Sequence, residues 1–135
     1  MNESTTFPAT APEFDAIVIG AGFGGLYALH KLRNEQGLNV RLFDKASDVG
    51  GTWYWNRYPG ALSDSETEVY CYSFDKELLQ ERDFDSSYVN QPKILGYLNH
   101  VTDRYDLRRS MQFNTGISAS HFDEARKLWV VKTEQ

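Results

Sequence analysis

Hydrophobic runs and a helical pattern alternate over the first third of the chain. Residues 15–20 read Asp-Ala-Ile-Val-Ile-Gly, and an apolar, β-branched run that stops at glycine is typical of a strand buried on both faces. From Phe23 the apolar residues recur at helical spacing as far as Gly37, which predicts a helix that ends at this glycine. Val40–Phe43 predicts a second strand. Strand, helix and strand within about 30 residues form a right-handed, parallel βαβ unit.

The segment after the second strand has no hydrophobic period. Residues 45–65 contain Gly50-Gly51, Pro59-Gly60 and a cluster of aromatic residues. A structured connection of this length is usually functional. Residues 66–79 mix aromatic with acidic side chains and are predicted to be partly helical.

The last third of the chain predicts a helix, a strand and a hairpin. Pro92 is expected at the first helical position, and four apolar residues follow it at helical spacing: Ile94, Leu95, Leu98 and Val101. Residues 111–114 predict a third strand, and residues 117–122 and 128–131 are expected to be extended on either side of a turn. The fold class is therefore α/β, with a Rossmann-like three-layer arrangement around a parallel sheet and a C-terminal β-hairpin.

Length and charge limit the classes of protein to which this chain could belong. The 135 residues amount to one domain and exclude two complete nucleotide-binding domains. The net charge of -5 argues against general electrostatic binding to nucleic acid or to anionic membranes. No stretch is apolar for long enough to span a bilayer. Cys71 is the single cysteine, so no internal disulfide can form and a cytoplasmic location is expected.

A glycine motif lies between the first strand and the first helix. In Gly20-x-Gly22-x-x-Gly25, the first glycine makes the tight turn, the second lets a diphosphate approach the backbone, and the third lets the helix pack closely on the sheet. The N–H groups near Phe23 and Gly24 would then face the phosphates. The alternative is a glycine-rich turn of an ordinary α/β protein. The complete βαβ context favours a dinucleotide site.

Asp44 is the second element of this site. It ends the second strand about 20 residues after the glycines, where an acid binds the two ribose hydroxyls of an adenosine. A carboxylate disfavours a 2′-phosphate, which leaves FAD or NAD rather than NADP at this site. A solvated acid at the end of a strand is the alternative, and the spacing favours the ribose role.

Two longer runs resemble a known family. Residues 15–27 and the run Gly-Gly-Thr-Trp-Tyr-Trp-Asn-Arg-Tyr-Pro-Gly-Ala over residues 50–61 closely resemble the N-terminal part of Baeyer–Villiger monooxygenases of the cyclohexanone monooxygenase type. Residues 70–74, 88–97 and 113–115 fit as well, and the resemblance extends from Asp15 to Glu134. The glycine motif alone is shared by many flavoproteins, whereas the tryptophan-rich run is far more specific.

The resemblance implies a set of cofactor-binding residues. FAD would contact the glycines, Phe23 and Asp44, and the flavin would lie beside Gly51, Thr52, Trp53 and Tyr70. Ile117 would contact the adenine through its backbone, and Leu62, Ser63 and Asp64 would face NADPH. Asp64 would also lie near the flavin ring in a supporting catalytic role. From the residues alone, Trp53 is equally suited to a core or an interface, and Asp64 to a loop.

The implied activity needs more protein than this chain contains. Members of the family use NADPH to reduce FAD and then use O2 to convert ketones to esters or lactones. Their Phe-x-Gly-x-x-x-His-x-x-x-Trp fingerprint, second glycine-rich unit and active-site arginine have no counterpart here. We expect residues 1–13 to form a flexible arm and residues 14–135 to form an incomplete FAD-binding domain without the NADP-binding domain. Such a chain would bind FAD weakly, would be inactive alone, and would leave an edge of the strand at residues 17–19 exposed.

Two other functions remain open. The chain could act as a stand-alone, non-catalytic flavin- or nucleotide-binding module. It could also belong to a related flavin N- or S-oxygenase, although the run over residues 53–60 argues against this class. No Cys, His and carboxylate cluster suggests a metal site, and no arrangement of Ser, His and acid suggests a hydrolase.

Overall fold

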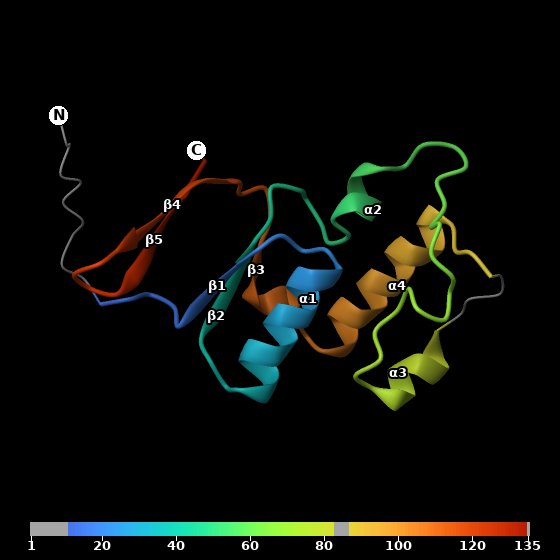
Figure 1. The fold of residues 1–135 in the computed structure, drawn as a ribbon, viewed down its shortest axis with the longest axis horizontal. Coiled ribbons are helices and arrows are strands. Elements are labelled where there is room, and N and C mark those ends of the chain that lie inside the picture. Colours follow the sequence, from blue (N-terminus) through green and yellow to red (C-terminus); the bar gives the residue numbers. More distant parts are fainter. Residues whose placement is uncertain (1–10, 83–86, 135) are drawn as a thin grey trace.

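The computed structural model describes residues 11–82 and 87–134, so most of the arm predicted over residues 1–13 lies outside the described residues. Three parallel strands form the central sheet: β1 (Ala16–Ile19), β2 (Val40–Phe43) and β3 (Met111–Gln112) (Figure 1). Their order is β1-β2-β3, so β2 is the central strand. An antiparallel hairpin of β4 (Ile117–Asp123) and β5 (Leu128–Thr133) follows. The α/β class, the parallel sheet and the hairpin are confirmed.

The predicted βαβ unit is present. Helix α1 (Phe23–Leu29) continues as a π-helical segment, η1 (His30–Glu35), and returns the chain to β2. Gly37 has a φ of +69°, a conformation that glycine adopts at little cost, and it ends the helix as predicted. Leu26 and Leu29 are completely buried, and α1 packs against β1 and β2. The helix therefore covers the sheet with the apolar face that its spacing predicts.

The prediction that the first strand is buried on both faces is wrong. Only Val18 is buried in β1, and the side chain of Ile19 is 59% exposed. The reason is topological: among the described residues β1 pairs with β2 alone, so one edge of β1 is open, as the resemblance implied. By contrast, β2 pairs on both sides, and three of its four residues are buried.

Three helices occupy the middle of the chain. The long connection contains the one-turn helix α2 (Thr52–Trp55), and α3 (Lys76–Glu81) begins later than the helix predicted over residues 66–79 because Asp75 caps it. Helix α4 (Gln91–Arg104) is capped by the Asn90 side chain, so Pro92 is the second helical residue rather than the first. A 3₁₀ turn, η2 (Arg108–Ser110), then leads into β3.

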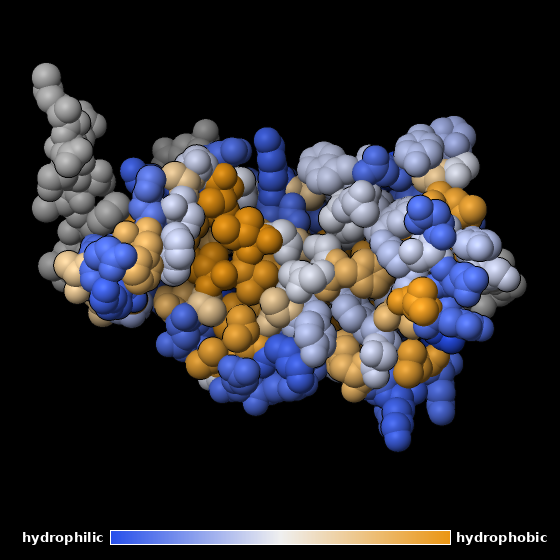
Figure 2. Space-filling view, in the orientation of Figure 1, coloured by the Kyte–Doolittle hydropathy of each residue, from blue (hydrophilic) through white to orange (hydrophobic). Residues whose placement is uncertain are grey.

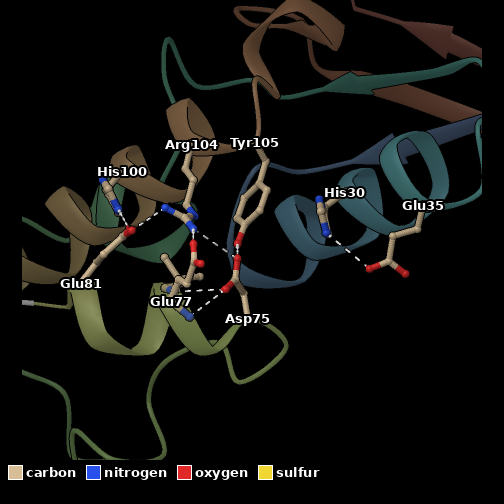
Figure 3. Close-up of polar contacts among 9 residues, drawn as sticks. His30, Glu35, Asp75, Glu77, Glu81, His100, Arg104 and Tyr105 are labelled. Atoms are coloured by element: carbon tan, nitrogen blue, oxygen red, sulfur yellow. Dashed lines mark hydrogen bonds and ion pairs between the residues drawn. The ribbon is translucent and has the colours of Figure 1, made fainter.

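Ion pairs join α3 to α4 at the surface (Figure 3). Arg104 of α4 lies 3.5 Å from Asp75 and 3.0 Å from Glu77, and it also pairs with Glu81. His100, one helical turn before Arg104, lies 2.8 Å from the same Glu81. Exposed pairs of this kind contribute little individually, but a guanidinium shared by three acids orients the short helix.

A groove of about 700 Å³ separates the start of β1 from the hairpin. Ile17 and Ile19 line one wall and Trp129, which is 65% exposed, lines the other. Figure 2 shows hydrophobic side chains gathered over this part of the molecule. Within residues 11–82 and 87–134, no helix has the length and apolar character needed to cross a bilayer.

Candidate dinucleotide-binding site

The turn between β1 and α1 depends on two glycines. Gly20 has a φ of +97°, and its N–H donates to the Phe43 carbonyl over 2.8 Å, which ties the turn to β2. A Cβ on Gly25 would lie 1.7 Å from the Gly20 carbonyl oxygen. The helix can therefore approach the strand this closely only without a side chain at residue 25, as the motif predicts.

A second pair of glycines packs against this turn. Gly51 has a φ of +57°, and a Cβ on it would lie 2.9 Å from the Gly22 Cα. The Gly50 N–H donates to the Ala21 carbonyl over 2.9 Å. The residues alone identified only the first glycine motif, and the resemblance alone pointed to Gly51. We call the two segments, residues 20–25 and residues 50–51, the glycine cradle.

The start of α1 presents N–H groups that the helix itself does not use. The Leu26 N–H donates to the Gly22 carbonyl over 3.0 Å and closes the first helical turn. The amides before it, up to Gly25, therefore have no acceptor within the helix. A Cβ on Gly24 would meet nothing within 4 Å, so the space beside this residue is open. Such amides, at the positive end of a helix dipole, suit a diphosphate.

Asp44 connects the cradle to the end of β2. One carboxylate oxygen accepts the Ala21 N–H over 2.7 Å, and the other accepts the Ala46 N–H over 2.8 Å. Each oxygen keeps further lone-pair capacity, so both can still accept a ribose hydroxyl. The Thr115 N–H donates to the Asp44 carbonyl over 2.9 Å, which brings Ile117 at the start of β4 toward the same edge of the sheet.

Aromatic side chains form a wall beside the cradle. Phe23, the first residue of α1, meets the ring of Tyr70 edge-on with the ring centres 4.9 Å apart. The Trp53 indole N–H donates to the Tyr70 hydroxyl over 2.8 Å. Thr52, next to Trp53 at the start of α2, is exposed. The structure thus brings together four of the residues to which the resemblance assigns the flavin side or the phosphates.

The other predicted residues lie further along the loop. Leu62 is 54% exposed and forms an isolated bridge with Asn90, while Ser63 is buried and its N–H donates to the Val89 carbonyl over 2.9 Å. Asp64 is exposed. Leu62 lines a hollow of about 440 Å³ at the start of α4. This run packs against the entry to α4 and has no hydrogen bond to the cradle among those described.

Three residues of this region were assigned no role from the sequence. Gln91 is buried, and its side-chain N–H donates to the Trp53 carbonyl over 2.6 Å. Tyr72 and Tyr97, also buried, connect α4 to α1. A polar residue at the start of α4 and a tyrosine on its apolar face were the available signals. Within the described part of the chain, no group of three or more His, Cys, Asp or Glu side chains could hold a metal ion.

The chain is similar to known proteins with a Rossmann-like domain. Residues 18–85 match the family model of the NAD(P)-binding Rossmann-like domain. A Baeyer-Villiger monooxygenase of Pseudooceanicola batsensis is 64% identical over 122 residues, which is 90% of this chain and 22% of that protein. A phenazine N-monooxygenase, PhzNO1 of Lysobacter antibioticus, is 59% identical over 89% of this chain and 22% of that protein.

Solved structures show the same fold. The cyclohexanone monooxygenase from Rhodococcus sp. Phi1, bound to NADP+, is 57% identical with a TM-score of 0.87, over 90% of this chain and 23% of that one. OTEMO, in complex with FAD and NADP, is 39% identical with a TM-score of 0.84, over 93% of this chain and 23% of that one. The chain spans about a fifth of the length of the proteins it matches.

Proposed function

Because this chain belongs to the NAD(P)-binding Rossmann-like domain family, we propose that it forms the FAD-binding part of an NADPH- and O2-dependent monooxygenase that converts ketones to esters or lactones. The observation that carries the proposal is the glycine cradle. The backbones of Gly20 and Gly25, and those of Gly22 and Gly51, approach too closely for a side chain on Gly25 or Gly51, and the Asp44 carboxylate accepts the Ala21 N–H beside them. Two such approaches would be unnecessary in an ordinary turn.

The residues present fit an adenine dinucleotide. Amides near Phe23 and Gly24 would bind the diphosphate, Asp44 the ribose and the backbone of Ile117 the adenine. The flavin would lie along Gly51, Thr52, Trp53 and Tyr70. NADPH would reach it from the side of Leu62, Ser63 and Asp64, with Asp64 in a supporting role. When bound, FAD supplies electron transfer and activation of O2, while these residues bind and orient it.

The single cysteine supports a cytoplasmic location.

A substitution at Gly22 tests the cradle. The φ of Gly22 is -87°, which any residue adopts, and a Cβ there would make only an ordinary 3.6 Å contact with Gly51. Gly22→Ala should therefore fold normally, and it should weaken FAD binding at least roughly tenfold because the methyl group keeps the diphosphate from the backbone. Flavin fluorescence titration of the purified 135-residue chain measures this.

The matched control is Gly96→Ala. A Cβ on Gly96, on the exposed side of α4, would meet nothing within 4 Å, so this variant should fold normally and bind FAD like the parent chain. Equal FAD affinity of the Gly22→Ala and parent chains would contradict the cradle. No binding of FAD by the parent chain at millimolar concentration would contradict the proposal as a whole.

One relative favours a second candidate function. A protein named as a phenazine N-monooxygenase is 59% identical to this chain, so likeness over this segment does not exclude N-oxygenation. Two chimaeras distinguish ketone oxygenation from N-oxygenation. In one, this chain replaces the matching segment of the Baeyer-Villiger monooxygenase, and in the other that of the phenazine N-monooxygenase. Ketone oxygenation retained by the Baeyer-Villiger chimaera supports the proposal, whereas retention of N-oxygenation alone supports the alternative.

A further inference from the structure

Two buried tyrosines connect α4 to the first turn of α1. The Tyr72 hydroxyl donates to the backbone carbonyl of Phe23, and the Tyr72 N–H donates to the Tyr97 hydroxyl over 2.9 Å. Tyr72 is 9% exposed and Tyr97 is 6% exposed. Their hydroxyl groups are thus bonded to backbone groups, and this connection reaches the cradle from α4 at the Phe23 carbonyl.

The direction of each bond is fixed by chemistry. A carbonyl oxygen can only accept, so the Tyr72 hydroxyl must carry its proton, and a backbone N–H can only donate, so the Tyr97 oxygen must accept. Burial raises the pKa of Tyr97 to about 12 and raises the pKa of Tyr72 above its ordinary value. Both phenols therefore stay protonated at neutral pH, and the connection persists.

The same helix also holds the other side of the cradle. The Gln91 side chain donates to the Trp53 carbonyl, and a Cβ on Gly50 would lie 2.6 Å from the Leu95 side chain. Residues from the first two turns of α4 thus contact the segment after the second strand and, through Tyr72, the start of α1. The ring of Tyr72 also packs on the ring of Phe23, with the centres 5.2 Å apart.

We propose that Tyr72 and Tyr97 are positioning residues for the diphosphate-binding turn, which fix Phe23 and so direct the amides at the start of α1. This inference rests on the proposed function. Neither hydroxyl touches the cradle glycines, so the effect passes through the Phe23 carbonyl. Loss of either hydroxyl should let the first turn of α1 open more often without emptying any core volume.

Tyr72→Phe and Tyr97→Phe test the inference, with Tyr105→Phe as the matched control. The Tyr105 hydroxyl bonds to the side chain of Asp75, which caps α3, and not to the first turn of α1, so the control also removes one phenol hydrogen bond. The first readout is exchange of the Leu26 amide, which closes the first turn, relative to the Leu42 amide in β2. Removing one hydrogen bond should accelerate Leu26 exchange roughly three- to tenfold in Tyr72→Phe, less in Tyr97→Phe, and not in Tyr105→Phe.

The second readout is the dissociation constant for FAD at a temperature at which all variants are folded. Tyr72→Phe should weaken binding by a similar factor, and Tyr105→Phe should not. Unchanged Leu26 exchange or unchanged FAD affinity in Tyr72→Phe would overturn the inference. If the parent chain binds no FAD, the proposed function fails, and faster Leu26 exchange then shows a structural connection only, which also overturns the positioning role.

Discussion

The glycine cradle begins at the C-terminal end of β1 and the open edge runs along the same strand, yet the two are built differently. Every close approach in the cradle is between two glycines of this chain: Gly25 meets Gly20, and Gly51 meets Gly22. The edge has no such partner among the described residues, and Ile19 beside it is more than half exposed. In a parallel ladder alternate residues bond to the same neighbour. Since Gly20 donates to Phe43, the N–H groups of Ile17 and Ile19 point to the open side.

The difference teaches what the local sequence can specify. A close backbone approach requires glycine, so the residues that form the cradle can be recognised in the sequence. Whether a strand is central or at an edge depends on which strands lie beside it. An apolar run such as residues 16–19 looks the same in both cases, and an unpaired apolar edge is a site of self-association.

The largest effect should come from Gly25→Ala. Its Cβ would overlap the Gly20 carbonyl oxygen at 1.7 Å, so helix and strand must separate, and we expect a loss of more than about 4 kcal/mol in the free energy of unfolding. Gly96→Ala on α4 is the control and should be neutral or stabilising by up to about 1 kcal/mol. Urea unfolding measures both. Tolerance of Gly25→Ala would show that the turn is looser than described.

The next effect compares the centre of the sheet with its edge. Leu42→Ala in β2 removes a completely buried side chain and should cost about 2–5 kcal/mol of unfolding free energy. Ile19→Ala in β1 should cost no more than about 0.5 kcal/mol because that side chain is mostly exposed. If Ile19→Ala proved as costly as Leu42→Ala, the edge would have to be covered, for example by a second copy of the chain.

The smallest effect is a pH dependence from His30. Its ring stacks on Phe74 and packs at a tilt against Tyr105, and burial lowers its pKa, against the opposing effect of Glu35. The Asn34 amide nitrogen lies 3.1 Å from His30 Nδ1 and can only donate, so this ring nitrogen is unprotonated. The other ring nitrogen of His30 faces Glu35 (Figure 3).

The sign follows from proton uptake. The unfolded chain protonates His30 near its ordinary pKa, whereas the folded chain does so only at lower pH. The stabilising contribution is therefore complete above about pH 6.5 and is lost as the pH falls through the folded pKa. Urea unfolding at pH 7.5 and 5.5 should show a fall in stability that is smaller in His30→Gln. Equal pH dependence in both proteins would assign the effect to other groups.

The sequence predicted the backbone elements of the site better than the side chains that hold them in place. The βαβ unit, the role of Gly25 and the end of β2 at Asp44 follow from local patterns, and the structure has them. The contact between Gly51 and Gly22 could not be derived from spacing, because a long aperiodic connection can return to many places. Gln91 and Tyr97 stand out in the helical pattern of α4, but no role was assigned to them or to Tyr72 because their partners are backbone groups, which the sequence does not identify.

The central claim is that this chain binds an adenine dinucleotide at the glycine cradle and not in the groove beside β1. Titration of the isotope-labelled chain with FAD, followed by amide NMR shifts, tests it most directly. We predict the largest shifts at residues 20–25, 44–46 and 50–53, further shifts at Tyr70 and Ile117, and an unchanged Trp129 indole signal. Shifts centred on Trp129 and Ile19, or none at saturating FAD, would contradict the account.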